Sequence, residues 1–155
     1  MAEASSSAMG KLFTDLTGRH VTFSEQLYPI TPAVKQIYCI YFIKPMDTTR
    51  IIKADLSLLS SFAGALIGLP LESIKERVAE SKSNEALRDA LHEVMNIASR
   101  IVSIEHRAVF KGMYPDSNSL PADARKTLRT PWFASYFNVK IDSYEGGAFS
   151  LLASC

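Results

Sequence analysis

The sequence predicts an α+β fold in which helices pack on one mostly antiparallel sheet. The first observation is the order of segments, because helical patterns occupy the middle of the chain and strand patterns flank them. The second is the apolar run from Ile37 to Ile43, which is rich in β-branched and aromatic residues and too short for a helix. A length of 155 residues fits one domain, which we expect to span residues 1–155.

The first half of the chain is expected to begin with a flexible end at residues 1–10. Gly18 predicts the end of a first helix, because Gly commonly follows the last helical turn. Pro45 ends the best strand pattern, and Asp55 is a plausible cap for the helix after it. The expected elements are helices at 7–16, 56–66 and 71–80, and strands at 21–27 and 34–44.

The clearest helix is predicted from Asn84 to about Ser103, with Ser83 as its cap. Apolar residues recur there at spacings of three and four, as in a helix with one buried face. After it we expect a strand at 107–113, a loop at 114–121, a helical turn at 121–128, and strands at 133–141 and 148–153 joined by a hairpin loop at 142–147.

Composition excludes several classes of function. The net charge of +1 provides no electrostatic footprint for nucleic acid. No apolar run approaches the ~18 residues of a membrane span, and the N-terminus lacks the pattern of a signal peptide. The two cysteines and three histidines show no metal-ligand or redox spacing. We therefore expect a cytoplasmic, reduced protein that binds no metal.

One side of the longest predicted helix carries a polar stripe. Asp89, Glu93, Asn96 and Arg100 are separated by three or four residues, so they are neighbours on the surface opposite the apolar positions. The outer face of any amphipathic helix is polar, and this is one interpretation of the stripe. Asn96 favours a functional interpretation, because Asn is a mediocre helix former in mid-helix.

Two other patterns have structural interpretations. Arg125, Lys126 and Arg129 form a small basic cluster near Trp132, which we interpret as a solvated turn. The Gly-x-x-x-Gly pattern at residues 64–68 predicts close packing of the helix on a sheet and a helix end. Phosphate loops, nucleophile elbows and dinucleotide fingerprints do not occur in the sequence.

Residues 86–98 resemble the signature helix of the CheC/CheX/FliY family, which are phosphatases of a phosphorylated chemotaxis response regulator. The family pattern is Asp or Ser, three residues, Glu, two residues, Asn, and a Pro about 23 residues further on. Asp89, Glu93 and Asn96 match its first three positions. The resemblance covers roughly residues 34–155 and corresponds to the single-site CheX-like arrangement.

The resemblance implies that the chain docks on a CheY-like receiver domain and accelerates hydrolysis of its aspartyl phosphate. It assigns to Asn96 the positioning of the attacking water, and to Glu93 a pairing with the regulator's lysine. Asp89 and Arg100 are then expected at the contact with the partner. The resemblance implies no cofactor of the chain's own, since the partner supplies Mg²⁺, and it allows a homodimer.

The chain also departs from the family pattern. The family Pro would fall near Ser119, whereas this chain has Pro115 and Pro121, and His92 replaces a residue that is commonly small. A second hypothesis therefore stays open, namely a non-catalytic CheC-like binding module in a bacterial signalling or motility assembly.

Overall fold

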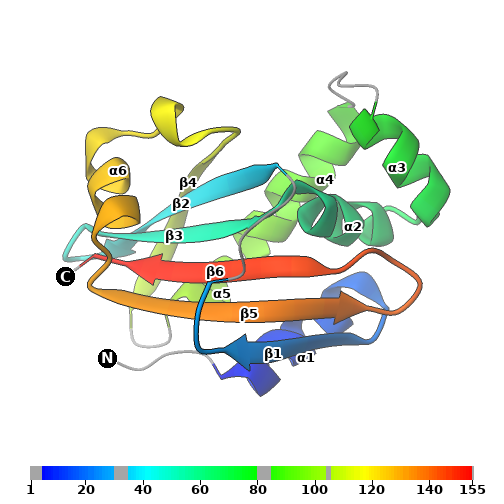
Figure 1. The fold of residues 1–155 in the computed structure, drawn as a ribbon, viewed down its shortest axis with the longest axis horizontal. Helices are drawn as coiled ribbons and strands as arrows, with labels where there is room; N and C mark the ends of the chain where they lie inside the picture. Colours follow the sequence, from blue (N-terminus) through cyan, green and yellow to red (C-terminus); the bar gives the residue numbers. More distant parts are fainter. Residues whose placement is uncertain (1–4, 30–34, 80–84, 104–105, 155) are drawn as a thin grey trace.

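Six strands form one antiparallel sheet in the part of the chain that the computed structural model describes (Figure 1). This part comprises residues 5–29, 35–79, 85–103 and 106–154. The strands lie in the order β1-β5-β6-β3-β2-β4. Their bounds are β1 Val21–Gln26, β2 Gln36–Lys44, β3 Thr48–Asp55, β4 Arg107–Tyr114, β5 Phe133–Ile141 and β6 Gly147–Ala153. The predicted α+β class is confirmed.

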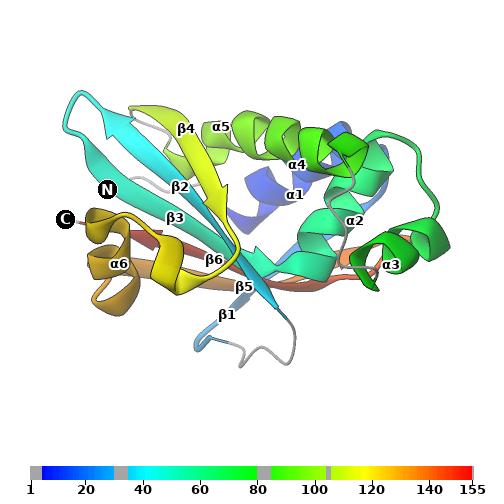
Figure 2. The ribbon, with the colours of Figure 1, turned by 90° about the horizontal axis from the view of Figure 1, so that it is seen from above.

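Helices lie on both faces of this sheet (Figure 2). Their bounds are α1 Ser6–Thr17, α2 Leu56–Leu66, α3 Leu71–Ala79, α4 Glu85–Ile97, α5 Ser99–Val102 and α6 Ala122–Arg129, with a short 3₁₀ helix, η1, at Ser117–Ser119. On one face lie α1, α2, α4 and α5, whereas η1 and α6 lie on the other. Among the described residues, no helix is long and apolar enough to cross a membrane.

Each face of the sheet has its own apolar core. Under α1, α2 and α4, the ring of Phe13 stacks on that of Phe62 at 4.4 Å and meets Phe149 edge-on at 6.1 Å. Such aromatic packing buries large apolar areas, and burial of apolar surface is the dominant favourable term in folding. The smaller core under α6 consists of Ile40, Ile51, Leu120, Ala124 and Leu152.

The central strand β3 was not predicted from the sequence. It pairs with β2 on one side and with β6 on the other, so every register position is supported by a neighbour. Its first half contains Thr49 and Arg50, polar residues that obscure a buried-strand pattern. Both are nevertheless buried, and the Arg50 guanidinium donates to the carbonyl of Val102 at the end of α5. Val102 follows Arg50 by 52 positions in the chain.

The N-terminal helix begins earlier than expected. Ser5 caps α1 by accepting a hydrogen bond from the backbone N–H of Ala8 at 3.1 Å, and Met9 is fully buried. The expected flexible end at residues 1–10 therefore does not extend to residue 10. Gly18 ends the helix with a φ of 70°, the left-handed conformation that Gly adopts without strain.

The helix predicted from Asn84 to Ser103 is two helices over its described residues, because the chain turns at Ala98 between α4 and α5. Its predicted first residue, Asn84, lies outside the described residues. The expected cap Ser83 lies outside the described residues, as do the predicted ends at Val34 and Glu80. Asp55 occupies the N-cap position of α2 but makes no capping hydrogen bond. Its carboxylate instead accepts hydrogen bonds from the backbone N–H of Ala148 and from the Gln36 amide.

Candidate functional site

Helix α4 presents the predicted polar face to solvent. The helix buries Ala90, Leu91, Val94 and Met95 against the sheet and α2. Asp89, Glu93 and Asn96 are exposed on its outer side. Residues spaced by four and three positions lie one turn apart, so the three side chains can contact one surface of a partner. The predicted exposed face is therefore present, and the roles of its residues remain predictions.

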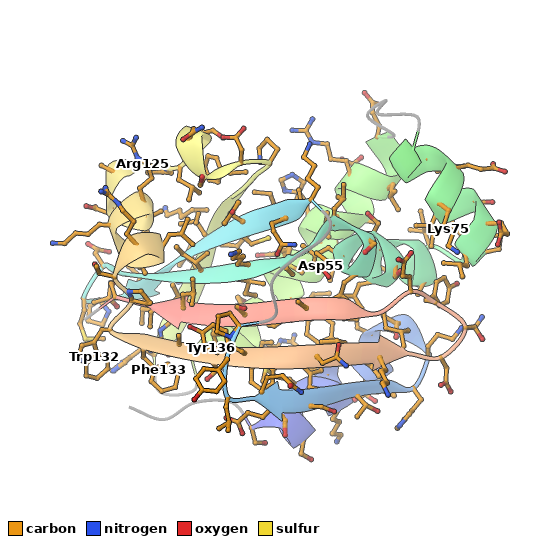
Figure 3. All side chains as sticks on the ribbon, viewed as in Figure 1. Asp55, Lys75, Arg125, Trp132, Phe133 and Tyr136 are labelled. Atoms are coloured by element: carbon orange, nitrogen blue, oxygen red, sulfur yellow. The ribbon has the colours of Figure 1, made fainter. Side chains whose placement is uncertain are left out.

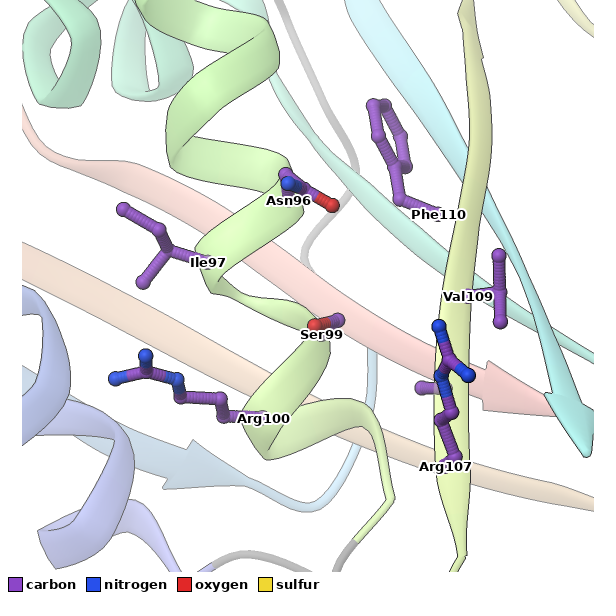
Figure 4. Close-up of a pocket in the computed structure, with 8 residues that line it drawn as sticks. Asn96, Ile97, Ser99, Arg100, Arg107, Val109 and Phe110 are labelled. Atoms are coloured by element: carbon purple, nitrogen blue, oxygen red, sulfur yellow. The ribbon is translucent and has the colours of Figure 1, made fainter.

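Arg100 does not continue this face. It is exposed but belongs to α5, which begins after the turn at Ala98. Its guanidinium points away from Asn96, to the far side of the helical segment from β4 (Figure 4). The expectation of one continuous four-residue stripe was wrong at this end, because the periodicity of a helix applies only while the helix continues.

Two buried hydrogen bonds hold the chain around this turn. The Tyr41 hydroxyl on β2 donates to the carbonyl of Met95 at 2.6 Å, and both side chains are fully buried. Arg50 on β3 holds the carbonyl of Val102 at the end of α5. Carbonyls near the end of a helix lack partners within that helix, so side chains from the sheet satisfy them here. These bonds fix the backbone on both sides of Asn96 and Ser99.

A hollow of about 380 Å³ lies between the α4–α5 segment and the edge strand β4. Asn96 and Ser99 line it from the helical side, and Arg107 and Phe110 line it from β4 (Figure 4). The remaining lining residues are Ile97, Arg100, Ala108 and Val109. Among the described residues, its wall therefore combines an amide, a hydroxyl and the guanidinium of Arg107, and it includes no carboxylate.

His92 packs toward the same strand. Its ring meets the ring of Phe110 at 5.8 Å with an interplanar angle of 61°, and its side chain is half-buried. A bulky residue at this position therefore has a packing partner on β4. The contact places His92 one turn before Asn96, on the side of α4 that faces β4.

Sequence reasoning did not find Arg107. The residue was recognised only as the first position of a strand, and nothing in its local pattern distinguishes it from other exposed strand residues. Its position beside Asn96 depends on how β4 pairs with β2 and how α4 packs on the sheet. Such contacts join distant parts of the chain and leave no local signal.

The other sequence candidates lie away from this region. Arg125, Lys126 and Arg129 are exposed on α6, on the opposite face of the sheet, and Figure 3 shows Arg125 on the outer side of that helix.

Gly64 of α2 faces Ile74 of α3, whose Cδ1 atom would lie 2.2 Å from an added Cβ. The packing at this Gly is close, but the neighbour is α3 and not the sheet that the sequence predicted. The described residues contain no group of three or more His, Cys, Asp or Glu side chains arranged to hold a metal ion.

No protein-family model and no curated protein sequence matches the chain. Solved structures do match its fold. The FliM middle domain from H. pylori is 13% identical with a TM-score of 0.65, and the match covers 96% of this chain and 84% of that one.

Two further matches are FliY from Thermotoga maritima and a chain of the CheX-CheY-BeF₃-Mg²⁺ complex from Borrelia burgdorferi. FliY is 11% identical with a TM-score of 0.51, covering 93% of this chain and 81% of that chain. The chain of the complex is 12% identical with a TM-score of 0.56, covering 94% and 92%. The protein therefore has the CheC/CheX/FliY-like fold, which it shares with the middle domain of FliM.

Proposed function

We propose that this protein docks on a phosphorylated receiver domain and accelerates hydrolysis of its aspartyl phosphate by positioning the attacking water. The observation that carries this proposal is the exposure of Glu93 and Asn96 one turn apart on α4, at the spacing of the family motif. The structural match to a chain of a CheX-CheY complex supports a receiver domain as the partner.

The chemistry needs little beyond geometry. Water attacks the phosphorus in line, the bond between phosphorus and the aspartyl oxygen breaks, and inorganic phosphate and the free carboxylate result. A side-chain amide can accept one hydrogen bond from water and donate another, which suits Asn96 to orienting the nucleophile. Positioning of this kind can contribute several kcal/mol to catalysis. The Mg²⁺ ion belongs to the receiver domain and needs no ligand from this chain.

Glu93 has a separate task in this proposal. Its exposed carboxylate pairs with the lysine of the receiver's active site and fixes the orientation of the complex. Asn96 then enters the same site, because it lies one turn further along the helix. Asp89, one turn before Glu93, contacts the partner at the edge, and Arg100 lies beyond the turn at Ala98.

The test is the phosphate lifetime of receiver domains from the same genome, measured with and without this protein. We expect faster phosphate loss with the wild type, no acceleration but retained binding with Asn96→Ala, and weakened binding with Glu93→Ala. Arg125→Gln on α6 is the matched surface control and should behave as the wild type. An Asn96→Ala protein with full activity would rule out the proposed mechanism.

A second candidate is a non-catalytic binding module in a signalling or motility assembly. The similarity to FliM middle domains favours it, with a TM-score of 0.65 for the protein from H. pylori against 0.56 for the chain of the CheX-CheY complex. The Pro of the family pattern is also displaced in this chain, which favours the same candidate. A receiver domain that binds this protein with an unchanged phosphate lifetime would support the binding module over the phosphatase.

A further inference from the structure

We infer that the hollow between the α4–α5 segment and β4 is an anion subsite for the phosphoryl group of a docked partner, with Arg107 as its cation. This inference rests on the proposed function and adds a residue that the family motif does not include. The subsite lies directly beside Asn96, which lines it.

The charge of the wall is the first argument. Arg107 and Arg100 are among the residues that line the hollow, and its described lining residues include no Asp or Glu. Arg107 is exposed, and neither guanidinium forms an ion pair with a carboxylate of the described residues. Among the described residues, the charge at the hollow is therefore positive and comes from Arg107, because the Arg100 guanidinium points away.

The orientation of the side chains selects Arg107 rather than Arg100. The Arg107 side chain runs along β4 in the direction of Val109, beside the space between the strand and the helical segment (Figure 4). Asn96 points toward that space from the other side, where Ser99 also lines the hollow, whereas Arg100 points away. A group held in the hollow is thus approached by a guanidinium from one wall and by a hydroxyl and an amide from the other.

This combination of groups suits phosphoryl oxygens. A guanidinium presents several N–H donors in a planar fork and binds phosphate with two parallel hydrogen bonds. The Ser99 hydroxyl and the Asn96 amide can donate to a third oxygen. Phe110, Val109 and Ile97 supply apolar surface beside these groups.

The position in the fold gives a large partner access to the hollow. Within the described parts of the chain, β4 is an edge strand whose one pairing partner is β2, and Asn96 on the rim is exposed. A receiver domain held by Glu93 would bring its phosphoryl group to Asn96, next to the hollow. Arg107 would then bind the non-bridging oxygens while the water held by Asn96 attacks the phosphorus.

The subsite can be tested without any partner, by titrating the isotope-labelled protein with inorganic phosphate and following side-chain N–H signals by NMR. We expect millimolar binding that shifts the signals of Arg107 and Asn96. Arg107→Gln should weaken this binding about ten- to a hundredfold, because hydrogen bonds between charged groups are the strong ones. Arg107→Lys should restore part of it, and Arg125→Gln, which changes the net charge equally, should have no effect.

Phosphate that fails to bind, or that binds equally well to Arg107→Gln, overturns the subsite. A similar loss in Arg125→Gln also overturns it, because the effect would then follow net charge rather than the hollow. These outcomes are independent of whether any receiver domain is dephosphorylated, so failure of the subsite and failure of the proposed function can be told apart.

The hydrolysis assay then identifies the source of the anion. If the phosphoryl group is the ligand, Arg107→Gln slows hydrolysis and weakens binding of the phosphorylated receiver, with little change for the unphosphorylated form. If Arg107 instead contacts an acidic side chain of the partner, both forms lose affinity equally, and that result overturns the assignment to the phosphoryl group.

Discussion

The phenolic hydroxyl of Tyr41 hydrogen-bonds at 2.6 Å to the main-chain carbonyl of Met95, the residue that directly precedes Asn96. The bond links β2 to the last turn of α4, and both side chains are fully buried. The position of the candidate amide is thus fixed from inside the protein, by a residue that cannot contact any partner.

Removing this hydroxyl should affect both stability and activity. We expect Tyr41→Phe to lower the free energy of unfolding by about 1–3 kcal/mol, because a buried carbonyl loses its partner. Urea denaturation measures this loss, and Tyr38→Phe, at a half-buried position on the same strand, is the control. The receiver assay should show a lower maximal rate with nearly unchanged binding. Wild-type stability in Tyr41→Phe would contradict the anchoring role.

Two buried groups predict how stability depends on alkaline pH. Burial raises the pKa of the Cys39 thiol and the pKa of the Tyr41 hydroxyl well above their ordinary values. The folded protein therefore keeps protons that the unfolded chain releases above about pH 8.5 for Cys and pH 10 for Tyr. Their contribution to stability is complete below these values and falls as the pH rises, by up to about 1.4 kcal/mol per unit and group.

Urea unfolding between pH 7 and 10.5 checks this expectation. Cys39→Ala should reduce the decline of the unfolding free energy that begins near pH 8.5, whatever its effect on stability at neutral pH. Tyr41→Phe should reduce only the part of this decline above about pH 10. If the free energy of unfolding falls equally steeply with pH in the wild type and in both variants, other groups cause its decline.

Asp55 and Gly147 form a close contact between the end of β3 and the start of β6. The carboxylate accepts a hydrogen bond of 2.9 Å from the N–H of Ala148, and an added Cβ at position 147 would lie 2.5 Å from Oδ2. We expect Asp55→Ala to destabilise the protein by about 1–3 kcal/mol. Gly147→Ala should also destabilise it, because the carboxylate must move away from its donor.

A double-mutant cycle separates this contact from general effects of either substitution. Gly147→Ala should cost less in the Asp55→Ala background than in the wild type, with a coupling energy of about 0.5 kcal/mol or more. Independent, additive effects of the two substitutions would show that the Gly is not required by the carboxylate.

The exposed face of α4 yields a prediction about docking. Under the proposed function, Glu93→Gln should weaken binding of the receiver domain at least about tenfold, since it removes one partner of a buried charge pair. Asp89→Asn, at the edge of the contact, should mainly lower the association rate and its dependence on salt. Surface plasmon resonance at two salt concentrations resolves the two effects. Because both residues are exposed, unfolding free energies should stay within about 0.5 kcal/mol of the wild type.

The sequence predicted the parts of this site that local periodicity determines. Asp89, Glu93 and Asn96 lie on one exposed face because a single helix carries all three. The position of Arg100 could not be predicted from periodicity, because the helix is interrupted at Ala98. Side chains from the sheet hold the helix ends on both sides of this turn, and the local sequence does not show these contacts. The carbonyl of Met95 is bound by Tyr41, which lies 54 positions away along the chain.

The same distinction explains the rest of the fold. The prediction succeeded for β2, whose apolar run is visible locally, and failed for β3, whose burial of Arg50 depends on the distant carbonyl of Val102. The hollow beside Asn96 depends on the pairing of β4 with β2. Contacts of this kind are properties of the assembled sheet and cannot be inferred from a sequence window.

The place of β6 in the sheet has a consequence for how the protein is made. Although it is the last strand among the described residues, it lies between β5 and β3 and pairs with both. Before Gly147–Ala153 leaves the ribosome, the strands can form only two separate sheets, β1 with β5 and β3 with β2 and β4. A nascent chain that stalls before residue 147 would expose two unpaired strand edges that can pair with other chains. Completion of the sheet therefore waits for Gly147–Ala153 to be synthesised.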